Sequence, residues 1–168
     1  MTEARTADQE TYEKTLATIF ENSLFYKYGL LPFKTDGSTG RYIARVNGEL
    51  AGLFAYTFTG ENEITIDHVG LLPEYRNKGL GSPLLQASLE LLARKGFSGT
   101  VIVEFLLDDV TLFNFYIKGG FTVSKAVVMH YGKEGGMNFE GTPFEFLEFT
   151  RDNQVHHFIP WIYMQKKI

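Results

Sequence analysis

Residues 64–85 read ITIDHVGLLPEYRNKGLGSPLL and join a strand-like half to a helix-like half through a glycine-rich turn. The first half is rich in β-branched residues, which favours a buried strand. The second half places apolar side chains on one helical face, because they recur at the spacing of a helix. The positions on this face are Leu84, Leu85, Ser88, Leu91 and Leu92. The stretch therefore predicts a strand, a tight turn and an amphipathic helix in direct succession.

The turn between the two halves, residues 76–82, has the composition of an anion-binding site. Gly79 and Gly81 let the backbone approach a ligand closely, and the N–H groups at a helix start lack intrahelical acceptors. The positive end of the helix dipole and the charges of Arg76 and Lys78 further favour phosphate. The alternative interpretation is a tight strand-to-helix connection that binds nothing.

Two common nucleotide-binding patterns do not fit this turn. A P-loop requires Lys followed by Ser or Thr directly after its last glycine, whereas Gly81 is followed by Ser82 and Pro83. A dinucleotide fingerprint requires a third glycine at position 84, which is Leu84. The pattern that the turn keeps is Arg-x-x-Gly-x-Gly directly after a strand.

Composition limits the class of protein. A chain of 168 residues is most simply one domain and is long enough to bury a core. The formal net charge of −4, with no basic face to offset it, argues against nucleic acid as a partner. No apolar run approaches the roughly 20 residues that span a membrane, and no N-terminal run resembles a signal peptide. The lack of cysteine excludes a disulfide scaffold, a thiolate zinc site and a cysteine nucleophile. These features favour a soluble, cytoplasmic protein.

The rest of the chain alternates between strand and helix signals. Asn47-Gly48 predicts a tight hairpin turn, and Gly96 and Gly119-Gly120 predict helix ends. We expect helices at 6–22 and 108–118, and strands at 41–46, 50–58, 100–107, 121–131, 143–149 and 158–164. Pro160 in the last strand suggests an edge position or a bulge. No strand is recognisable before residue 8.

Residues 115–121 read FYIKGGF and follow the glycine turn by about 40 residues. The turn and this segment, in this order and at this distance, resemble the two signatures of the GNAT superfamily of acyl-CoA-dependent N-acyltransferases. These signatures are the pyrophosphate loop Arg-x-x-Gly-x-Gly and the pattern Phe/Leu-Tyr-x-x-x-Gly-Phe. The resemblance covers roughly residues 61–131.

The resemblance implies an α/β (α+β) fold in one domain, residues 1–168. Its mixed, mostly antiparallel sheet is flanked by helices and splays open at the central strands, near residues 69–71. Acyl-CoA lies in that gap, and an acetyl group passes to a primary amine by direct attack, without a covalent enzyme intermediate.

The resemblance also assigns residues to the cosubstrate acetyl-CoA. The backbone groups of Val69 and Leu71 bond the pantetheine arm like an added strand, and Asp109 stands where the family often has an Asn that contacts this arm. The pyrophosphate is held by Arg76, Asn77, Lys78, Gly79, Leu80, Gly81 and Ser82. A backbone N–H near the opening polarises the thioester carbonyl, a contribution of about 3 kcal/mol.

Candidate catalytic residues follow from the same two segments. Tyr116, in the second signature, is the candidate acid for the departing thiolate, and a half-buried packing residue is its alternative. Asp67 and His68 are candidates for the base, directly or through a water. A solvated strand residue and a packed histidine are the respective alternatives. Weaker candidates for the base are Glu104, Glu145 and Glu148.

A metal site is not expected, although His130 and the pair His156-His157 lie in the C-terminal part. Adjacent residues of a strand point to opposite faces, so this pair would not converge on one ion.

The acceptor is a small-molecule or peptide amine whose identity the sequence does not contain, because this fold serves many substrates. Residues 23–33 are rich in aromatic side chains and form either core or an acceptor-binding wall. Residues 142–168 carry more apolar surface than two edge strands bury, which predicts a homodimer. Two other functions stay open: a non-catalytic acyl-CoA-binding or sensing module, and an interaction protein that uses its aromatic C-terminal half.

Overall fold

The computed structural model describes residues 2–3, 9–20, 38–106, 110–130, 133–137, 141–142, 145, 148, 151 and 160–168. The chain forms two compact units, residues 1–97 and 98–168, and each is described by itself. All strand pairs within the units are antiparallel.

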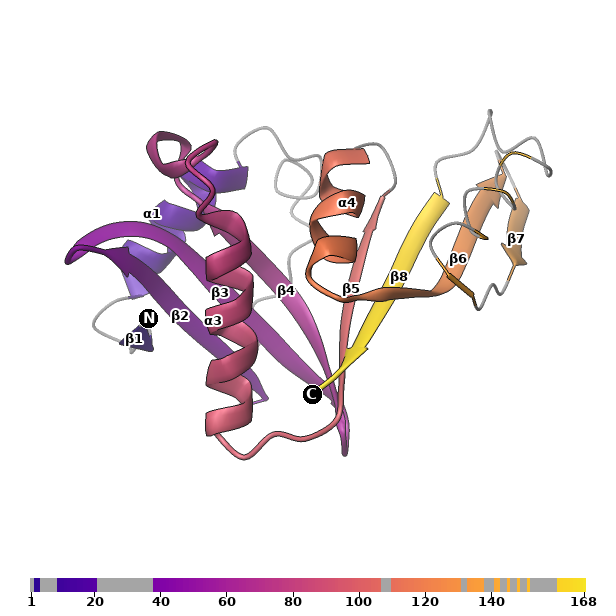
Figure 1. Ribbon diagram of the computed structural model, residues 1–168, viewed down its shortest axis with the longest axis horizontal. Helices are drawn as coiled ribbons and strands as arrows, with labels where there is room; N and C mark the ends of the chain where they lie inside the picture. The colour runs from indigo at the N-terminus through magenta and orange to yellow at the C-terminus, as the bar shows by residue number, and fades with distance from the viewer. Residues whose placement is uncertain are drawn as a thin grey trace. The chain divides into compact units, whose positions relative to one another are not determined.

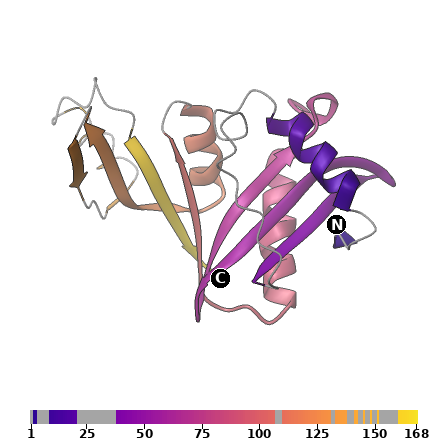
Figure 2. The same ribbon diagram turned by 180° about the vertical axis from the view of Figure 1, so that it is seen from behind.

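The first unit contains four strands in the order β1-β2-β3-β4. They are β1 (Thr2–Glu3), β2 (Thr39–Val46), β3 (Glu49–Gly60) and β4 (Glu63–Leu71). Its helices are α1 (Gln9–Phe20), the 3₁₀ turn η2 (Pro73–Tyr75) and α3 (Gly81–Arg94). The two long helices lie on opposite faces of the strands (Figure 1), and the view from behind shows α1 in front (Figure 2).

Successive side chains of β2 and β3 point to opposite faces of the strands. One set packs under α1 and the other under α3, so a separate apolar cluster lies beneath each helix. On the α1 face, the buried cluster consists of Tyr12, Leu16, Ile43, Leu53 and Ala55. On the other face, Tyr42 and Phe54 stack with their ring centroids 6.0 Å apart, and Lys95, just after α3, lies over the Tyr42 ring. Buried leucines of α3 complete this side. The period-two alternation of the strands thus matches the 3.6-residue faces of two helices.

Most predictions for this unit are confirmed. Asn47 and Gly48 both adopt positive φ, 54° and 87°, as a two-residue hairpin turn requires. The helix predicted after the glycine turn is α3, and Pro83 lies in its first turn. The predicted helix at 6–22 is described from Gln9 to Phe20. The short strand β1 was not predicted, because two residues are too few to show a pattern.

The second unit has the strand order β5-β8-β6-β7 and one described helix, α4. The elements are β5 (Thr100–Leu106), α4 (Val110–Lys118), β6 (Thr122–His130), β7 (Lys133–Met137) and β8 (Pro160–Lys167). The last strand of the chain therefore lies between β5 and β6, and Ile162 and Met164 are fully buried in it. Part of the apolar C-terminal surface is thus buried within the chain itself, and packing on a second copy stays a prediction.

Two predictions for this unit are wrong. Pro160 marks neither an edge strand nor a bulge: β8 is paired on both sides, and Pro160 is its first residue, where the missing N–H costs no ladder bond. A strand was predicted at residues 143–149, whereas Glu145 and Glu148 are helical. The inserted strand is β7, ten residues earlier.

The helical start at residue 142 has a clear physical cause. The Thr142 hydroxyl donates to the Glu145 carboxylate over 2.7 Å, and the backbone N–H of Glu145 donates back to that hydroxyl over 3.3 Å. The Thr142 N–H also donates to the same carboxylate, at 2.6 Å. These bonds form a capping box, so Thr142 followed three residues later by Glu145 was the signal that outweighed the aromatic strand pattern.

The helices α3 and α4 end in the same way. After α4, the N–H of Phe121 donates to the Tyr116 carbonyl and the N–H of Gly120 to the Ile117 carbonyl, at 3.1 and 2.9 Å. After α3, the N–H groups of Phe97 and Gly96 make the equivalent bonds to Leu92 and Ala93. Gly96 and Gly120 have φ of 85° and 82°. Both ends are therefore Schellman caps, in which the glycine takes the left-handed conformation.

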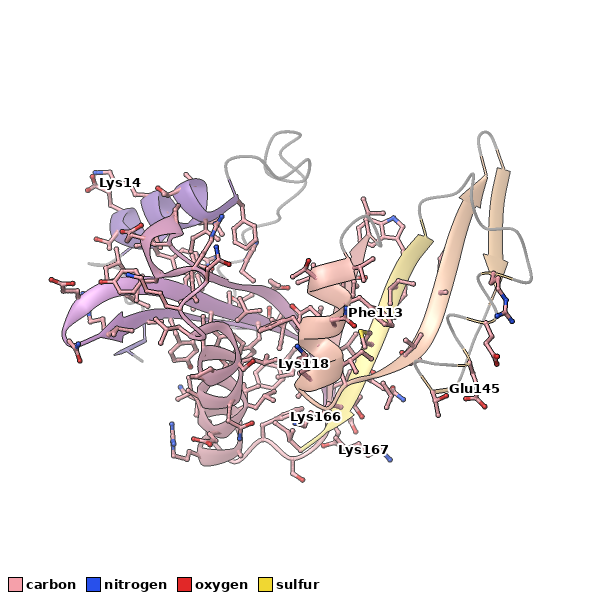
Figure 3. The ribbon with its side chains drawn as sticks, turned by 45° about the horizontal axis from the view of Figure 1, so that its top comes forward. Lys14, Phe113, Lys118, Glu145, Lys166 and Lys167 are labelled. Atoms are coloured by element: carbon pink, nitrogen blue, oxygen red, sulfur yellow. The ribbon has the colours of Figure 1, made fainter. Side chains whose placement is uncertain are left out.

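The two cap glycines form a matched pair for substitution. Alanine in the left-handed region costs about 1–2 kcal/mol, so Gly96→Ala and Gly120→Ala both lower the free energy of unfolding. A Cβ at Gly96 meets nothing within 4 Å, whereas one at Gly120 lies 3.2 Å from the Lys166 Nζ. That ammonium donates to the Gly119 carbonyl over 2.7 Å and lies beside the end of α4 (Figure 3). We therefore expect the larger loss at Gly120, measured by urea denaturation.

The control for this comparison is Lys166→Met. In the Lys166→Met background, alanine at Gly96 and at Gly120 lowers the free energy of unfolding by the same amount. The reason is that the hydrogen bond from Lys166 to the Gly119 carbonyl is already absent. Equal losses with Lys166 present would contradict its part in this helix end.

Candidate functional site

A break in strand register places two sequence-predicted residues on one face of the first unit. Ala55 of β3 pairs with His68, whereas the next residue, Tyr56, pairs with Ile66, so Asp67 is an extra residue in β4. Such a bulge turns successive side chains to the same side of the sheet. The Asp67 carboxylate accepts a 2.7 Å hydrogen bond from the Thr57 hydroxyl. The bulge thus lies two residues before the opening that was expected near Val69.

His68 lies under the last turn of α1. Its ring centroid is 5.3 Å from that of Phe20, and neither ring nitrogen has exposed surface or a hydrogen-bond partner among the residues that the structure describes. Burial, with the nearby Arg41 charge adding to it, lowers the pKa of His68 to about 4. The imidazole is therefore neutral at physiological pH, and both of its nitrogens are buried without a partner among the described residues.

A small polar cluster extends from the bulge toward α1. The Arg41 guanidinium lies 5.7 Å from the centroid of the Tyr12 ring. Burial raises the pKa of Tyr12, with Arg41 acting against the shift and Asp67 adding to it. Sequence reasoning did not find Tyr12, Arg41 or Thr57. They come from three elements, and only the register across the bulge brings them beside Asp67.

The residues after the bulge alternate between the two faces. Val69 and Leu71 pair with Phe54 and Gly52 on the α3 side. Gly70 points the other way, toward Ile19 of α1, where a Cβ would come within 2.6 Å of the Ile19 Cγ2. Gly70 is therefore required for α1 to lie this close to β4.

The glycine turn leaves several N–H groups free at the start of α3. Asn77 and Gly79 have φ of 58° and 73°, and the first backbone bond of α3 runs from the Leu84 N–H to the Leu80 carbonyl, at 3.0 Å. No side chain caps this helix start, and Pro83 has no N–H to offer. Among described residues, no acceptor pairs with the N–H groups of residues 80–82. Unpaired N–H groups at the positive end of a helix favour a bound anion.

The charged side chains of the turn are already engaged. Arg76 donates from Nε to the Leu71 carbonyl over 3.1 Å and from Nη2 to the Ile19 carbonyl over 2.8 Å. The Lys78 ammonium lies 5.7 Å from the centroid of the Tyr75 ring, and the Tyr75 hydroxyl donates to Glu49 over 2.9 Å. Arg76 is predicted to bind phosphate, and in this structure its Nε and Nη2 already hold two backbone carbonyls.

Tyr116 belongs to the second unit and is buried among rings. Its centroid is 5.5 Å from Phe105, 5.1 Å from Phe115 and 5.5 Å from Phe121. Burial raises the pKa of Tyr116, so its phenol stays protonated at any physiological pH. A proton donor needs this state, and the same burial is also what a packing residue shows. The structure gives Tyr116 both properties at once.

The weaker candidates for the base have structural partners. Glu104 accepts a hydrogen bond from Tyr163, whose pKa is raised by burial and by this carboxylate. Glu145 forms the capping box, which lowers its pKa, and Glu148 lies 3.9 Å from Arg151. Asp109, the pair at 156–157 and residues 23–33 lie outside the described residues, as does the side chain of His130.

Family membership follows from the sequence of residues 2–121, which include β4, the glycine turn and Tyr116. The model of the "Acetyltransferase (GNAT) family" matches residues 2–121, which is more than half of the chain and includes both signatures. The chain belongs to the GNAT acetyltransferase family. It is therefore an acyltransferase by family. No curated protein matches the chain in sequence.

Solved GNAT structures share the fold at low identity. A Bacillus subtilis acetyltransferase in complex with CoA has 15% identity and a TM-score of 0.62, over 95% of this chain and 92% of that one. The ribosomal-protein-S18-alanine N-acetyltransferase of Escherichia coli has 16% identity and a TM-score of 0.63, over 99% and 92%. A chimera of Vibrio cholerae spermidine N-acetyltransferase and hSSAT has 11% identity and a TM-score of 0.65, over 99% of this chain and 94% of the chimera. The predicted α/β fold, with mostly antiparallel strands and flanking helices, is confirmed.

Two negative findings hold for the described part of this GNAT chain. None of the helices found there is long and apolar enough to cross a membrane. The same residues contain no group of three or more His, Asp or Glu that could hold a metal ion.

His68 makes the stability of this GNAT protein depend on pH. Its folded pKa of about 4 lies below the unfolded value near 6.5, so the unfolded state binds more protons between these pH values. Stability is therefore complete above pH 6.5 and is lost as the pH falls toward 4. The expected loss between pH 7 and pH 5 is about 2 kcal/mol.

The measurement is urea denaturation of wild type and His68→Gln at both pH values. Carboxylates titrate in both proteins, so the difference between the two losses isolates the imidazole. Parallel losses in the two proteins would show that His68 is not buried in its neutral form.

Proposed function

We propose that this protein transfers an acetyl group from acetyl-CoA to a primary amine. The observation that carries the proposal is the succession of the bulged strand β4, the turn at 76–80 and the start of α3. This segment lies in the region that matches the family. It presents N–H groups without a described acceptor at the start of α3, and Asp67 and His68 on β4. A binding site for a phosphate-bearing donor thus adjoins polar groups suited to an amine.

The donor fits the turn through backbone groups. The N–H groups of residues 80–82 bind pyrophosphate oxygens, and Lys78, in the same turn, adds positive charge. The backbone of Val69 and Leu71 bonds the pantetheine arm, as the family resemblance implies. The donor choice is supported by related structures determined with CoA or, in the Elizabethkingia anophelis GNAT enzyme, acetyl-CoA bound.

The acceptor site is proposed on the α1 face of β4. Asp67 is exposed, and its negative charge attracts an alkylammonium ion. Related structures carry names that specify an alanine of ribosomal protein S18 and spermidine as the groups that are N-acetylated. The acceptor class is therefore a primary amine, from a small molecule or a peptide.

The reaction needs two protons to leave the acceptor nitrogen. The bound alkylammonium first gives one proton to a base, and the neutral nitrogen then attacks the thioester carbonyl carbon. The carbon–sulfur bond breaks, and the nitrogen loses its second proton as the sulfur gains one. Asp67 is better placed than His68 to receive the first proton through water, because its carboxylate is exposed whereas both imidazole nitrogens are not. His68, neutral and packed on Phe20, supports the acceptor face from within.

Tyr116 is the proposed hydrogen-bond donor to the departing sulfur. Its raised pKa lies above that of a thiol, near 8.5, so full transfer to a free thiolate is uphill. The phenol therefore acts by hydrogen-bonding the charge that develops on sulfur as the bond breaks. This limits its contribution to the range of general acid catalysis, about 10²-fold.

Two other functions make different predictions. A non-catalytic acyl-CoA-binding module binds acetyl-CoA without turnover over a broad panel of amines. An interaction protein that uses its C-terminal half, as a homodimer or with another protein, binds no CoA at all. The buried position of Ile162 and Met164 within the second unit speaks against the latter.

The donor site is tested by thermal shift. At a concentration of 100 times its Kd, acetyl-CoA stabilises the protein by about 2.7 kcal/mol, which raises the Tm by about 5–10 °C. Gly81→Val abolishes this shift, because a side chain at the first residue of α3 fills the space that the pyrophosphate needs. The control is Gly96→Ala, which lowers the Tm at the other end of α3 and keeps the shift. An equal shift in Gly81→Val and wild type rules out the turn as the phosphate site.

The acid is tested by Tyr116→Phe, which keeps the ring packing and removes only the hydroxyl. Acetyl-CoA affinity changes little, whereas kcat falls by about 10²-fold. Tyr163→Phe is the matched control, since it removes a hydroxyl bonded to Glu104 in the same unit and leaves kcat within about two-fold. Stopped-assay measurement of CoA release gives kcat and KM for each. An unchanged kcat in Tyr116→Phe removes this residue from the mechanism.

A further inference from the structure

The last turn of α1 is held by a residue 57 positions later in the chain. The final carbonyls of a helix lack intrahelical donors, and a cation near them also offsets the helix dipole. The last turn of α1 contains no basic residue of its own. Arg76 supplies the missing cation: its Nη2 donates to the Ile19 carbonyl over 2.8 Å.

The same turn contacts β4 at two further points. Ile19 lies directly over Gly70, so close that a Cβ there would be 2.6 Å from its Cγ2. The Phe20 ring lies 5.3 Å from the His68 ring. The end of α1 is thus held against β4 by packing at Gly70 and His68, and by hydrogen bonding at Arg76.

The Arg76 guanidinium hydrogen-bonds both β4 and α1. Its Nε donates to the Leu71 carbonyl at the end of β4 over 3.1 Å, while Nη2 holds α1. Its Nη1 makes no hydrogen bond to any described residue, and the side chain is exposed. Arg76 also begins the turn whose N–H groups are proposed to hold phosphate. A planar guanidinium can bind an oxyanion through one edge while its other nitrogens keep their carbonyls.

We propose that Arg76 is a positioning residue that couples occupancy of the phosphate turn to the last turn of α1. An oxyanion on Nη1 fixes the guanidinium, which then holds the Ile19 carbonyl more firmly, and with it Phe20 against His68. The inference rests on the proposed function and adds an order to it: the donor binds first and prepares the acceptor face of β4. Coupling of this kind is reciprocal, so release of α1 weakens donor binding by the same factor.

The test is hydrogen exchange of the amides of residues 17–20, followed by mass spectrometry with and without CoA. In the wild type, CoA slows this exchange. In Arg76→Ala without CoA, exchange is about ten-fold faster than in wild type, the effect of losing one net hydrogen bond, and CoA no longer slows it. Arg76→Lys keeps the charge but has one nitrogen for two carbonyls, so it gives an intermediate rate and remains informative where alanine disturbs folding.

Lys78→Ala is the matched control. It removes the same charge from the same turn, but its ammonium lies over Tyr75 and not on α1. Exchange of residues 17–20 is therefore unchanged in the absence of CoA, and saturating CoA still slows it. The proposal is overturned if Arg76→Ala leaves this exchange unchanged, or if CoA slows it in Arg76→Ala as in wild type. Failure of wild type to bind CoA in calorimetry contradicts the proposed function, while the exchange rates without CoA still test the contact between Arg76 and α1.

Discussion

One extra residue in β4 sets the arrangement on which the first unit depends. Without the bulge at Asp67, alternation would turn His68 toward α3 and place Val69 opposite Leu53, under α1. A valine there would collide with Ile19, which tolerates only the hydrogen of Gly70. The bulge therefore brings a glycine beneath the helix and two polar side chains beside it. That single shift of register accounts for the close packing of α1 on β4 and for the cluster around Asp67. It also brings Ile19 within hydrogen-bonding distance of Arg76.

The second signature of the family has a structural meaning that extends beyond catalysis. Tyr-x-x-x-Gly-Phe at 116–121 is a Schellman cap, in which Phe121 packs on Tyr116 with the ring centroids 5.5 Å apart. The end of α3 repeats it as Leu92-x-x-x-Gly96-Phe97, with the same two hydrogen bonds. Gly and Phe therefore report a helix end, and only the tyrosine distinguishes the α4 segment. The residues of the second signature alone therefore indicate a helix end. They indicate the GNAT family only together with their distance from the glycine turn.

Local patterns predicted the elements well, and contacts between distant residues account for what they missed. The hairpin at Asn47-Gly48, the helix after the glycine turn and the helix before Gly120 follow from rules that act within a few residues. The internal position of β8 and the bulge at Asp67 depend on which strands pair, and no local pattern contains that information. Arg76 shows the same limit within the site: its charge favoured phosphate, but no local pattern indicated that its guanidinium also bonds carbonyls of two other elements. The capping box at Thr142 is also a local pattern, and sequence reasoning missed it beside the aromatic residues that follow.

The central claim is that free N–H groups at the start of α3 and the polar face at Asp67 serve one reaction, acetyl transfer to an amine. The most direct measurement is CoA release from acetyl-CoA, detected as free thiol, across a panel of primary amines that includes polyamines, amino acids and peptide N-termini. The account predicts release that depends on at least one amine, with the acetylated amine found by mass spectrometry in equal amount. Tight binding of acetyl-CoA with no amine-dependent release over the whole panel would contradict it.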